Sequence, residues 1–445
     1  EAAPALLGSI ELVREDGSVR PEWLSLIAHL DRLSADERER AFARGAQYLR
    51  DAGVFVRHYG EENNPRDWPL SPVPVIQPAS EWQALGTALA ERADLLEAVV
   101  ADLYGENRLV SEGHLPASLI ASNPEWLRPL VGVKPASGHF LHFLAFEIGR
   151  GPDGAWWVLG DRTQAPSGAG YALENRVASV RAFPGFYSGS NVERLVSFFR
   201  GFRDGLNGMR HEDGSRAGIL TPGPMNETYF EHAYIARYLG MMLLEGDDLV
   251  VDDGKLMVRT VSGPKPISVL WRRMDAAWSD PLELEANSRL GTPGLLGAVR
   301  SQGVTMINAL GTGILESRAF LAFMPRLSEI LHGKKLSIPN VATWWCGSEA
   351  ERDHVRAHAG EMMIGSAHST RLPLEPEPGA VLRGEMSEIG LDLDTWLARE
   401  GRNLVGQELV SLSTTPTWEE GQLKPRPMRI RVFMARTRDG WQLMP

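Results

Sequence analysis

The stretch of the sequence most informative about chemistry is residues 156–176, WWVLGDRTQAPSGAGYALENR, where an expected strand ends in an acid and a glycine-rich loop follows. Glycines let backbone N–H groups converge on an anion without obstruction by side chains. Gly168 and Gly170 are suited to place such N–H groups, while Ser167 can add a hydroxyl and Arg176 a bidentate guanidinium. The loop therefore predicts a binding site for phosphate oxygens.

Two acids lie close to this loop in the sequence. Glu147 follows an expected buried strand at residues 140–146, and Asp161 ends the expected returning strand. In a hairpin with its turn at residues 152–154, the two carboxylates would face each other, and Thr163 or Gln164 would supply a further oxygen. Paired carboxylates are what a magnesium ion that bridges two phosphates requires. The alternative is a solvated hairpin edge whose acids are neutralised by nearby arginines, namely Arg150 and Arg162.

The elements that must position these residues follow from periodicity. Helical spacing of apolar residues predicts two helices between residues 22 and 59 and a longer one at 81–103. Residues 217–275 alternate between strand and helix, as in an α/β layer, with extended segments expected at 218–220, 241–244, 256–258 and 267–271 and a helix at 229–238. Further strands are expected at residues 404–405 and 430–433.

Composition limits the classes of function. The chain has 445 residues, 43% of them hydrophobic, and a formal net charge of −11, which argues against a surface for nucleic-acid backbones. Its single cysteine, Cys346, excludes an intrachain disulfide and a multi-cysteine zinc site, and we expect it to be a packing residue. No apolar run approaches the roughly 20 residues that cross a bilayer, and residues 1–8 lack a signal-peptide pattern. We therefore expect a soluble, cytoplasmic protein without a membrane partner.

A set of longer motifs occurs in a fixed order along the chain. They are LYGENR (103–108), GRGPDGAWWVLGDRTQAPSGAGYALENR (149–176), TPGPMNETYFEHAYIARYLG (221–240), EGDDL (245–249), WRRMD (271–275), NALGTG (308–313) and PNVATWWCG (339–347). In this order they resemble the circularly permuted ATP-grasp family (type 2), which is related to glutathionylspermidine synthetase. The resemblance covers most of the chain from residue 20 to residue 440.

The resemblance implies a fold of the α/β (α+β) class, a circularly permuted ATP-grasp fold with a helical N-terminal region. It implies four parts: a helical region at 1–135, the permuted metal-binding part at 136–210, a Rossmann-like layer at 211–285, and the remaining ATP-grasp lobes at 286–445. The implied activity is that of a carboxylate–amine ligase that uses ATP and Mg2+ and works through an acyl phosphate. Small-molecule or peptide acids and amines would be its substrates.

Individual roles follow by matching motifs. The metal-binding pattern of the family falls on Glu147, Asp161 and Thr163, where the family usually has aspartate at the first position and asparagine at the last. The pair Gln407 and Glu408 resembles the hinge that binds adenine.

Four arginines are further candidates for binding anions. Arg429 and Arg431 alternate on one strand face and can reach phosphate. Arg272 and Arg273 end an expected buried strand and can bind a phosphate or a substrate carboxylate, or else form an ion pair with Asp275 or Asp280.

Other candidates have a structural alternative of equal weight. Residues 226–232 can line a substrate cleft after a Gly-Pro loop, or Asn226 and Thr228 can cap the helix that follows. His232 is more typical of a core or surface histidine than of a catalytic base. Asn308, between glycines, can mark a tight turn or contact an anion.

One departure from the family pattern affects the predicted activity. Relatives carry Lys or Arg followed by Pro on a strand that contacts ATP phosphates, whereas this chain has Gly365 and Ser366 there. Losing one electrostatic donor in an active site can cost roughly 3 kcal/mol. Relatives also continue into a glycine-rich stretch beyond Pro445, which suggests a part of a longer polypeptide. The alternative function is therefore a catalytically degenerate ATP-grasp scaffold that binds nucleotide or serves as a partner in a protein assembly or a homo-oligomer.

Overall fold

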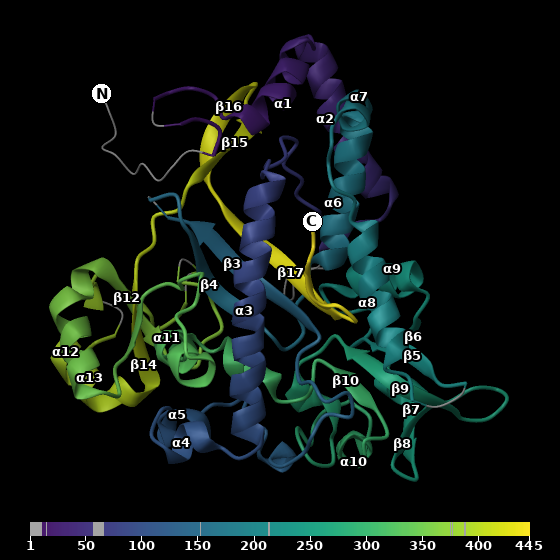
Figure 1. The fold of residues 1–445 in the computed structure, drawn as a ribbon, viewed down its shortest axis with the longest axis vertical. Helices are drawn as coiled ribbons and strands as arrows, with labels where there is room; N and C mark the ends of the chain where they lie inside the picture. The colour runs from purple at the N-terminus through teal and green to yellow at the C-terminus, as the bar shows by residue number, and fades with distance from the viewer. Residues whose placement is uncertain are drawn as a thin grey trace.

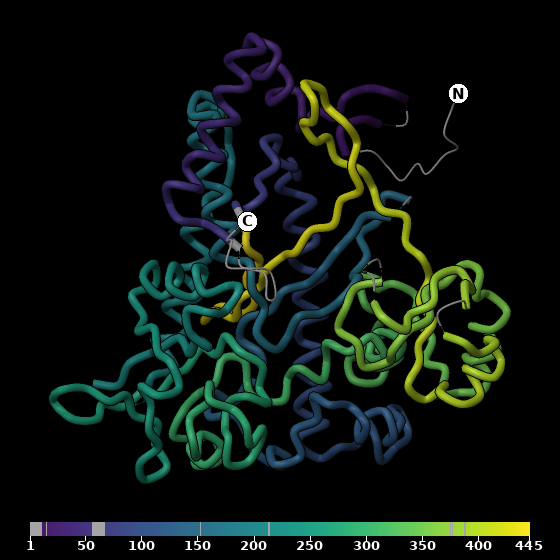
Figure 2. The backbone as a smooth tube through the Cα atoms, turned by 180° about the vertical axis from the view of Figure 1, so that it is seen from behind, coloured from purple at the N-terminus to yellow at the C-terminus, as the bar shows by residue number. Residues whose placement is uncertain are grey.

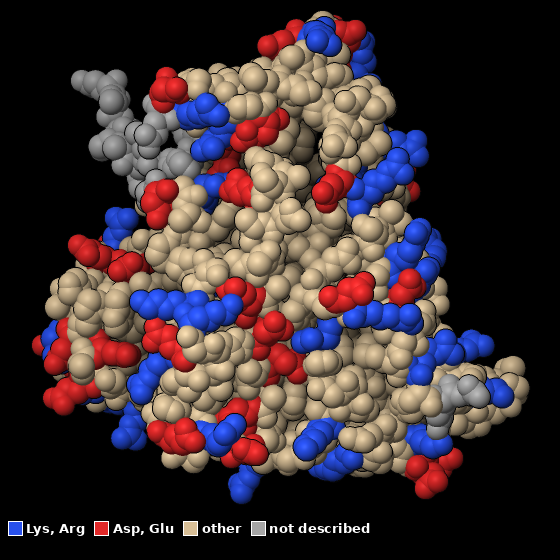
Figure 3. Space-filling model, viewed as in Figure 1, with Lys and Arg blue, Asp and Glu red and all other residues tan. Residues whose placement is uncertain are grey.

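The computed structural model describes residues 11–445 apart from residues 15, 57–65, 152, 212–213, 374, 376 and 387–388. Residues 1–8 and Pro152, which the sequence places at the N-terminus and in the hairpin turn, lie outside the described residues. None of the described helices is both long enough and apolar enough to pass through a bilayer. On the face drawn in Figure 3, basic and acidic side chains are interspersed rather than gathered by sign.

A four-stranded antiparallel sheet occupies the centre of the molecule (Figure 1). Its strands, in spatial order, are β18 (Gly440–Leu443), β17 (Arg429–Thr437), β3 (Phe143–Arg150) and β4 (Trp156–Arg162). The predicted hairpin at β3 and β4 is thus confirmed, and β17, from the end of the chain, pairs with the other side of β3. Figure 2 shows the C-terminal strand, in yellow, running beside β3.

Each face of this sheet packs against a different set of helices. Alternate residues such as Phe146, Val158 and Met434 belong to one apolar cluster, together with α3 (Ala79–Tyr104), the long helix that crosses the sheet in Figure 1. Phe143, Ala145 and Phe433 alternate with them and pack on the other face against α8 (Val196–Gly208). The period-two pattern therefore separates two cores.

A buried ion pair ties α3 to the central sheet. Arg92 of α3 donates from Nε and Nη2 to the two carboxylate oxygens of Asp161 on β4, at 2.7 and 2.8 Å. Both side chains are 0% exposed, and Arg92 also donates from Nη1 to Asn340 Oδ1 at 3.2 Å. This geometry is bidentate and desolvated, and it fixes α3 on the central sheet.

The second sheet has a parallel part that matches the expected α/β layer. Its parallel strands are β6 (Met242–Leu244), β5 (Arg216–Leu220), β9 (Lys265–Arg272) and β10 (Thr305–Ile307), with β8 (Lys255–Val258) and β7 (Leu249–Asp252) continuing in antiparallel pairing. Helix α9 (Tyr229–Leu239) connects β5 and β6, as the periodicity predicts. The predicted boundary at residue 285 leaves out β10, although β10 pairs with β9.

A smaller lobe lies at the lower left of Figure 1. Its sheet has the order β11 (Thr343–Trp345), β14 (Leu404–Glu408), β12 (Met362–Ser366) and β13 (Val381–Leu382). Helices α12 (Glu349–His358) and α13 (Leu393–Glu400) pack on one face of this sheet, and α11 (Arg318–His332) packs on the other. Cys346 is buried as expected, and burial raises the pKa of its thiol to about 12.

The remaining elements complete the frame. They are α1 (Pro21–Asp31), α2 (Ala35–Asp51), β1 (Phe55–Val56), β2 (Arg66–Asp67), α4 (Arg108–Ser111), α5 (Ala117–Ala121), α6 (Ala169–Ala182), α7 (Pro184–Gly189), α10 (Leu295–Arg300), β15 (Thr414–Glu419) and β16 (Gln422–Pro427), with 3-10 turns η1 (Arg128–Leu130), η2 (Gly246–Asp248), η3 (Ala276–Ser279), η4 (Thr312–Glu316), η5 (Ala359–Glu361) and η7 (Gly401–Asn403). The helices predicted near residues 22–59 and 81–103 correspond to α1, α2 and α3.

The Arg92 and Asp161 pair generates a stability prediction. Asp161→Asn leaves a buried guanidinium without its counter-charge and should lower the free energy of unfolding by about 3–5 kcal/mol. The double variant Arg92→Met with Asp161→Leu should recover much of that loss because no charge then stays buried. Urea denaturation measures both.

The neighbouring residue Glu91 provides the control for this prediction. Its ion pair with Lys334 is at the surface, with side chains 24% and 54% exposed, so Glu91→Gln should change stability by less than about 1 kcal/mol. Equal losses in Asp161→Asn and Glu91→Gln would contradict the assignment of a fold-anchoring role to the buried pair.

Candidate functional site

Glu147 lies at the centre of a charged cluster on one face of the central sheet. Its carboxylate accepts from Arg431 Nε at 2.7 Å, Arg431 Nη2 lies 2.5 Å from the same oxygen, and Arg162 Nε lies at 3.7 Å. Strand register explains this grouping, because Arg431 is opposite Glu147 on β17 while Arg162 is opposite Ala145, two residues away on the same face. The side chain of Glu147 is only 3% exposed, so both guanidiniums compensate a largely desolvated charge.

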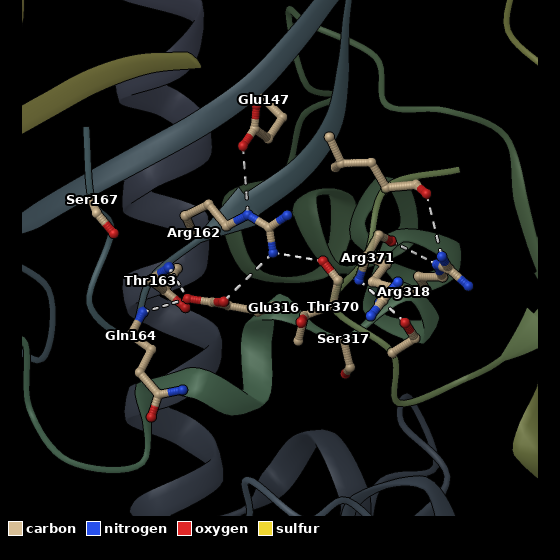
Figure 4. Close-up of polar contacts among 12 residues, drawn as sticks. Glu147, Arg162, Thr163, Gln164, Ser167, Glu316, Ser317, Arg318, Thr370 and Arg371 are labelled. Carbon is tan, nitrogen blue, oxygen red and sulfur yellow. Dashed lines mark hydrogen bonds and ion pairs between the residues drawn. The ribbon is translucent and has the colours of Figure 1, made fainter. Parts of the chain in front are cut away.

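A second carboxylate lies on the other side of Arg162, as Figure 4 shows. Glu316, the last residue of η4, accepts from the backbone N–H groups of Thr163 and Gln164 at 2.7 and 2.6 Å and lies 3.8 Å from Arg162 Nη1. Burial raises its pKa, although the nearby charge of Arg162 opposes the shift. The sequence analysis missed Glu316, although it follows directly on the glycine motif at residues 308–313.

The expectation that Glu147 and Asp161 face each other is wrong. Asp161 lies opposite Phe146 rather than Glu147, so its side chain points to the opposite face, where Arg92 binds both of its oxygens. Thr163 is fully buried, and its hydroxyl donates to the carbonyl of Thr312 at 2.8 Å. The described residues contain no group of three or more His, Cys, Asp or Glu side chains placed to hold a metal ion.

The predicted phosphate loop already binds an anion from within the chain. The N–H groups of Gly168 and Gly170 donate to Glu231 Oε1 at 2.8 and 2.9 Å, and Glu231 Oε2 lies 3.4 Å from Arg273 Nη2. Gly170 is required for this approach, since a Cβ there would lie 2.8 Å from Glu231 Cγ. Glu231 comes from α9 and is fully buried, so the loop as seen here is closed by a carboxylate.

The two side-chain donors predicted for the phosphate loop, Ser167 and Arg176, lie in different places. Ser167 is next to the charged cluster, since its carbonyl accepts from Arg431 Nη1 at 2.8 Å. Arg176 lies further along α6 and donates to the carbonyl of Glu193 at 2.6 Å. The structure therefore does not bring Arg176 to the glycine loop, because a helix carries it away from its own N-terminus.

Arg272 and Arg273 both occupy buried positions at the carboxyl end of β9. Arg272 donates to the carbonyls of Met274 and Gln164, and desolvation lowers its pKa to about 10 against the opposing charges of Asp275 and Glu125. Arg273 pairs with Glu231 rather than with either predicted acid.

Asp280 has a different role, since it accepts from backbone N–H groups at the start of α10. Of the two predicted ion-pair partners, only Asp275 acts electrostatically on Arg272, and Asp280 does not take part.

The remaining polar candidates of this edge have structural roles. His232 hydrogen-bonds Thr221 and Thr228 through its two ring nitrogens, and burial lowers its pKa well below the usual value. Asn308 joins the two sheets, since its amide bonds the backbone of His142, Phe143 and Thr163. A neutral, doubly bonded histidine and a saturated amide are typical of structural residues.

The predicted adenine hinge lies on β14 of the small lobe. Gln407 is buried, donates to Thr343 Oγ1 at 3.1 Å, and its Oε1 has no partner among the described residues. Glu408 ends β14 and is exposed, with its N–H bonded to the carbonyl of Ala342. Arg429 shares the sheet face of Arg431, as predicted, and donates to Glu375 at 2.8 Å.

The geometry is therefore a row of alternating charges rather than a pair of free carboxylates. Three arginines reach Glu147, Glu316 and Glu375 from the central sheet. The described part of the chain has two hollows that are not lined by these charged residues. One is apolar, and the other is lined by Arg203, Arg210 and Arg216. The arginines of such a row can bind the phosphates of a polyanion when these displace the carboxylates of the chain, and the released carboxylates can bind magnesium.

Comparison with known proteins identifies the family of this chain. The family described as circularly permuted ATP-grasp type 2 matches residues 74–445. The chain belongs to that family. The predicted α/β class is thus confirmed, with the strands β17 and β18 at its end completing the sheet of β3 and β4.

Proteins of similar sequence and of similar fold are known. An uncharacterized protein of Mycobacterium tuberculosis is 34% identical over 98% of this chain and 50% of its own length, and a second one is 31% identical over 95% and 76%. The chain thus spans about half the length of the first relative. A glutathione synthetase-like effector from Globodera pallida, in its apo form, has a similar fold, with a TM-score of 0.51, 10% identity and coverage of 91% and 95%.

The raised pKa of Glu316 predicts a pH dependence. The folded protein holds this proton to higher pH than the unfolded chain does, so the contribution favours folding at low pH and is lost as pH rises through the raised pKa. Wild type should therefore lose stability relative to Glu316→Gln as the pH rises from 4.5, the ordinary value of a glutamate carboxyl, toward neutrality. Urea denaturation of both proteins across this range measures the difference.

Glu91→Gln provides a control in which the pH dependence of stability has the opposite sign. Hydrogen bonds from Lys334 and Ser337 lower the pKa of Glu91, so wild type should gain stability relative to this variant as pH rises. If the stability of wild type and of Glu316→Gln changed with pH in the same way, the raised pKa of Glu316 would be contradicted.

Proposed function

We propose that this protein is an ATP-dependent carboxylate–amine ligase. The observation that supports this most directly is the cluster of Glu147, Arg431 and Arg162 on one face of the central sheet, beside the lobe that carries Gln407. Membership of the ATP-grasp family supports the same class of reaction. The γ-phosphoryl group of ATP would pass to a substrate carboxylate, and an amine would displace phosphate from the acyl phosphate to form an amide.

Magnesium fits the residues of this cluster. Mg2+ usually keeps several waters and takes one or two protein carboxylates together with phosphate oxygens. Glu147 provides one carboxylate, and Glu316 the second, across Arg162. We assign the second position to Glu316 rather than to Asp161 or Thr163. Asp161 points to the opposite face of the sheet, toward Arg92, and the hydroxyl of Thr163 donates to the carbonyl of Thr312. A magnesium ion in such a site offsets the charge that develops on the phosphates.

The nucleotide would lie between the central sheet and the small lobe. Arg162, Arg429 and Arg431 would bind phosphate oxygens in exchange for the carboxylates they hold here. Gln407 would offer its unpartnered Oε1 to adenine, with Glu408 next to it. Acid and amine substrates of small-molecule or peptide size would enter beside Ser167.

A second candidate is a scaffold without ligase activity. The observation in its favour is that Glu231 already occupies the N–H groups of Gly168 and Gly170, which would otherwise bind an anion. Such a protein would bind nucleotide weakly or serve as a partner in an assembly, since fold alone does not determine activity.

Nucleotide binding tests the proposal. Calorimetry should detect Mg-ATP binding to wild type, with a requirement for Mg2+. Glu147→Gln should lower this affinity by about tenfold or more because a metal ligand is lost. Glu91→Gln, on an exposed pair elsewhere, should match wild type. Absence of binding at millimolar Mg-ATP would rule out the ligase.

Turnover separates the two candidates once binding is established. ADP release should require both an acid and an amine from a panel of amino acids, peptides and polyamines. Mg-ATP binding without ADP release for any pair in the panel would favour the scaffold instead.

A further inference from the structure

The small lobe lacks a cation on β12, where the resemblance leads one to expect Lys or Arg. That position is Gly365, and it shares a sheet face with Met363 and, through strand pairing, with Gln407. This is the face covered by α11, not the face that packs against α12 and α13. A side chain at residue 365 would therefore project toward the same side as the predicted adenine hinge.

The space over Gly365 is filled by a guanidinium from another element. A Cβ built on Gly365 would lie 3.0 Å from Arg318 Nη1, which is tighter than the contacts that a Cβ normally makes. Arg318 is the first residue of α11, and its side chain is 3% exposed. Arg318 Nη1 also lies 3.8 Å from Met363 Sδ on β12. A positive charge therefore lies next to β12, although β12 itself carries none there.

The charge of Arg318 lies in an electrostatically unfavourable place. A cation at the N-terminus of a helix is opposed by the helix dipole. The side chain of Arg318 is also almost completely buried, so water does not compensate this charge. The compensating anion is Glu377, 2.5 Å from Nη1, and the other donors reach the carbonyls of Arg371 and Leu372.

Arg318 is also continuous with the charged cluster of the central sheet (Figure 4). It follows Glu316 by two residues. Arg162 donates to the carbonyl of Thr370 at 2.6 Å, and Arg318 donates to the next carbonyl, that of Arg371, at 2.7 Å. The same backbone segment therefore connects both guanidiniums.

We propose that Arg318 is a nucleotide-binding residue of this protein, which contacts a phosphate of ATP from α11 in place of the cation that β12 lacks at Gly365. The inference rests on the ligase proposal, since it assigns a residue to the same nucleotide site. The carboxylate of Glu377 occupies the guanidinium in this structure, and a phosphate oxygen exchanges with it on binding. The fork of an arginine suits both anions.

Moving the arginine from residue 318 to residue 365 on β12 tests this inference. Arg318→Gln should weaken Mg-ATP binding by about tenfold or more, as expected for a hydrogen bond to a charged group, while adenosine affinity stays the same. Gly365→Arg alone should lower the melting temperature, because the new side chain meets Arg318. Arg318→Ala combined with Gly365→Arg should restore both the melting temperature and Mg-ATP affinity relative to the respective single variants.

Glu377→Gln distinguishes ligand binding from a role in holding the backbone. If Arg318 only fastens residues 371 and 372 through Glu377, then Glu377→Gln should weaken Mg-ATP binding as much as Arg318→Gln does. If Arg318 binds phosphate, Glu377→Gln removes a competitor and does not weaken binding. Equal Mg-ATP affinity of wild type and folded Arg318→Gln, or no recovery in the combined variant, would overturn the inference alone. A wild type that binds no Mg-ATP would overturn the ligase proposal with it.

Discussion

The register between β3 and β4 is the constraint on which the candidate site depends. Successive side chains of a strand point to opposite faces, so a shift of one residue moves a carboxylate from one face to the other. Here Phe146 lies opposite Asp161, which sends Asp161 toward α3 and leaves Glu147 on the face of Arg162 and Arg431. The same two acids thus serve different purposes, one in anchoring a helix and one in a charged cluster.

Charge compensation inside the chain is the common feature of the residues around this cluster. Arg431 and Arg162 hold Glu147, Arg429 holds Glu375, and the amides of the glycine loop hold Glu231. Buried charges without partners are costly, so a protein that binds a polyanion must either hydrate its cations or pair them internally before the ligand arrives. Internal carboxylates fulfil that need here, and their exchange for phosphate is the physical basis of the proposed function.

The proposed role of Arg318 bears on how the departure at Gly365 is interpreted. On the strand alone, the loss of a cation suggests an inactive relative. In space, the guanidinium of Arg318 reaches the same place from the start of α11 and is compatible with Gly365 because that residue has no side chain. The two residues are far apart in sequence, and neither would draw attention to the other without the fold.

The sequence by itself determined the helices α1 to α3 and α9, the hairpin, the α/β layer and the permuted order, because each depends on local periodicity or on long ordered motifs. It gave no expectation for other helices, such as α8 and α11. It also placed Arg429 and Arg431 on one strand face, since alternation is a property of a single strand. Only the tertiary structure decided that Asp161 faces Arg92, that Glu231 fills the glycine loop and that Arg318 lies over Gly365. These contacts join segments far apart along the chain, and pairing register and helix packing, which no local pattern encodes, bring them together.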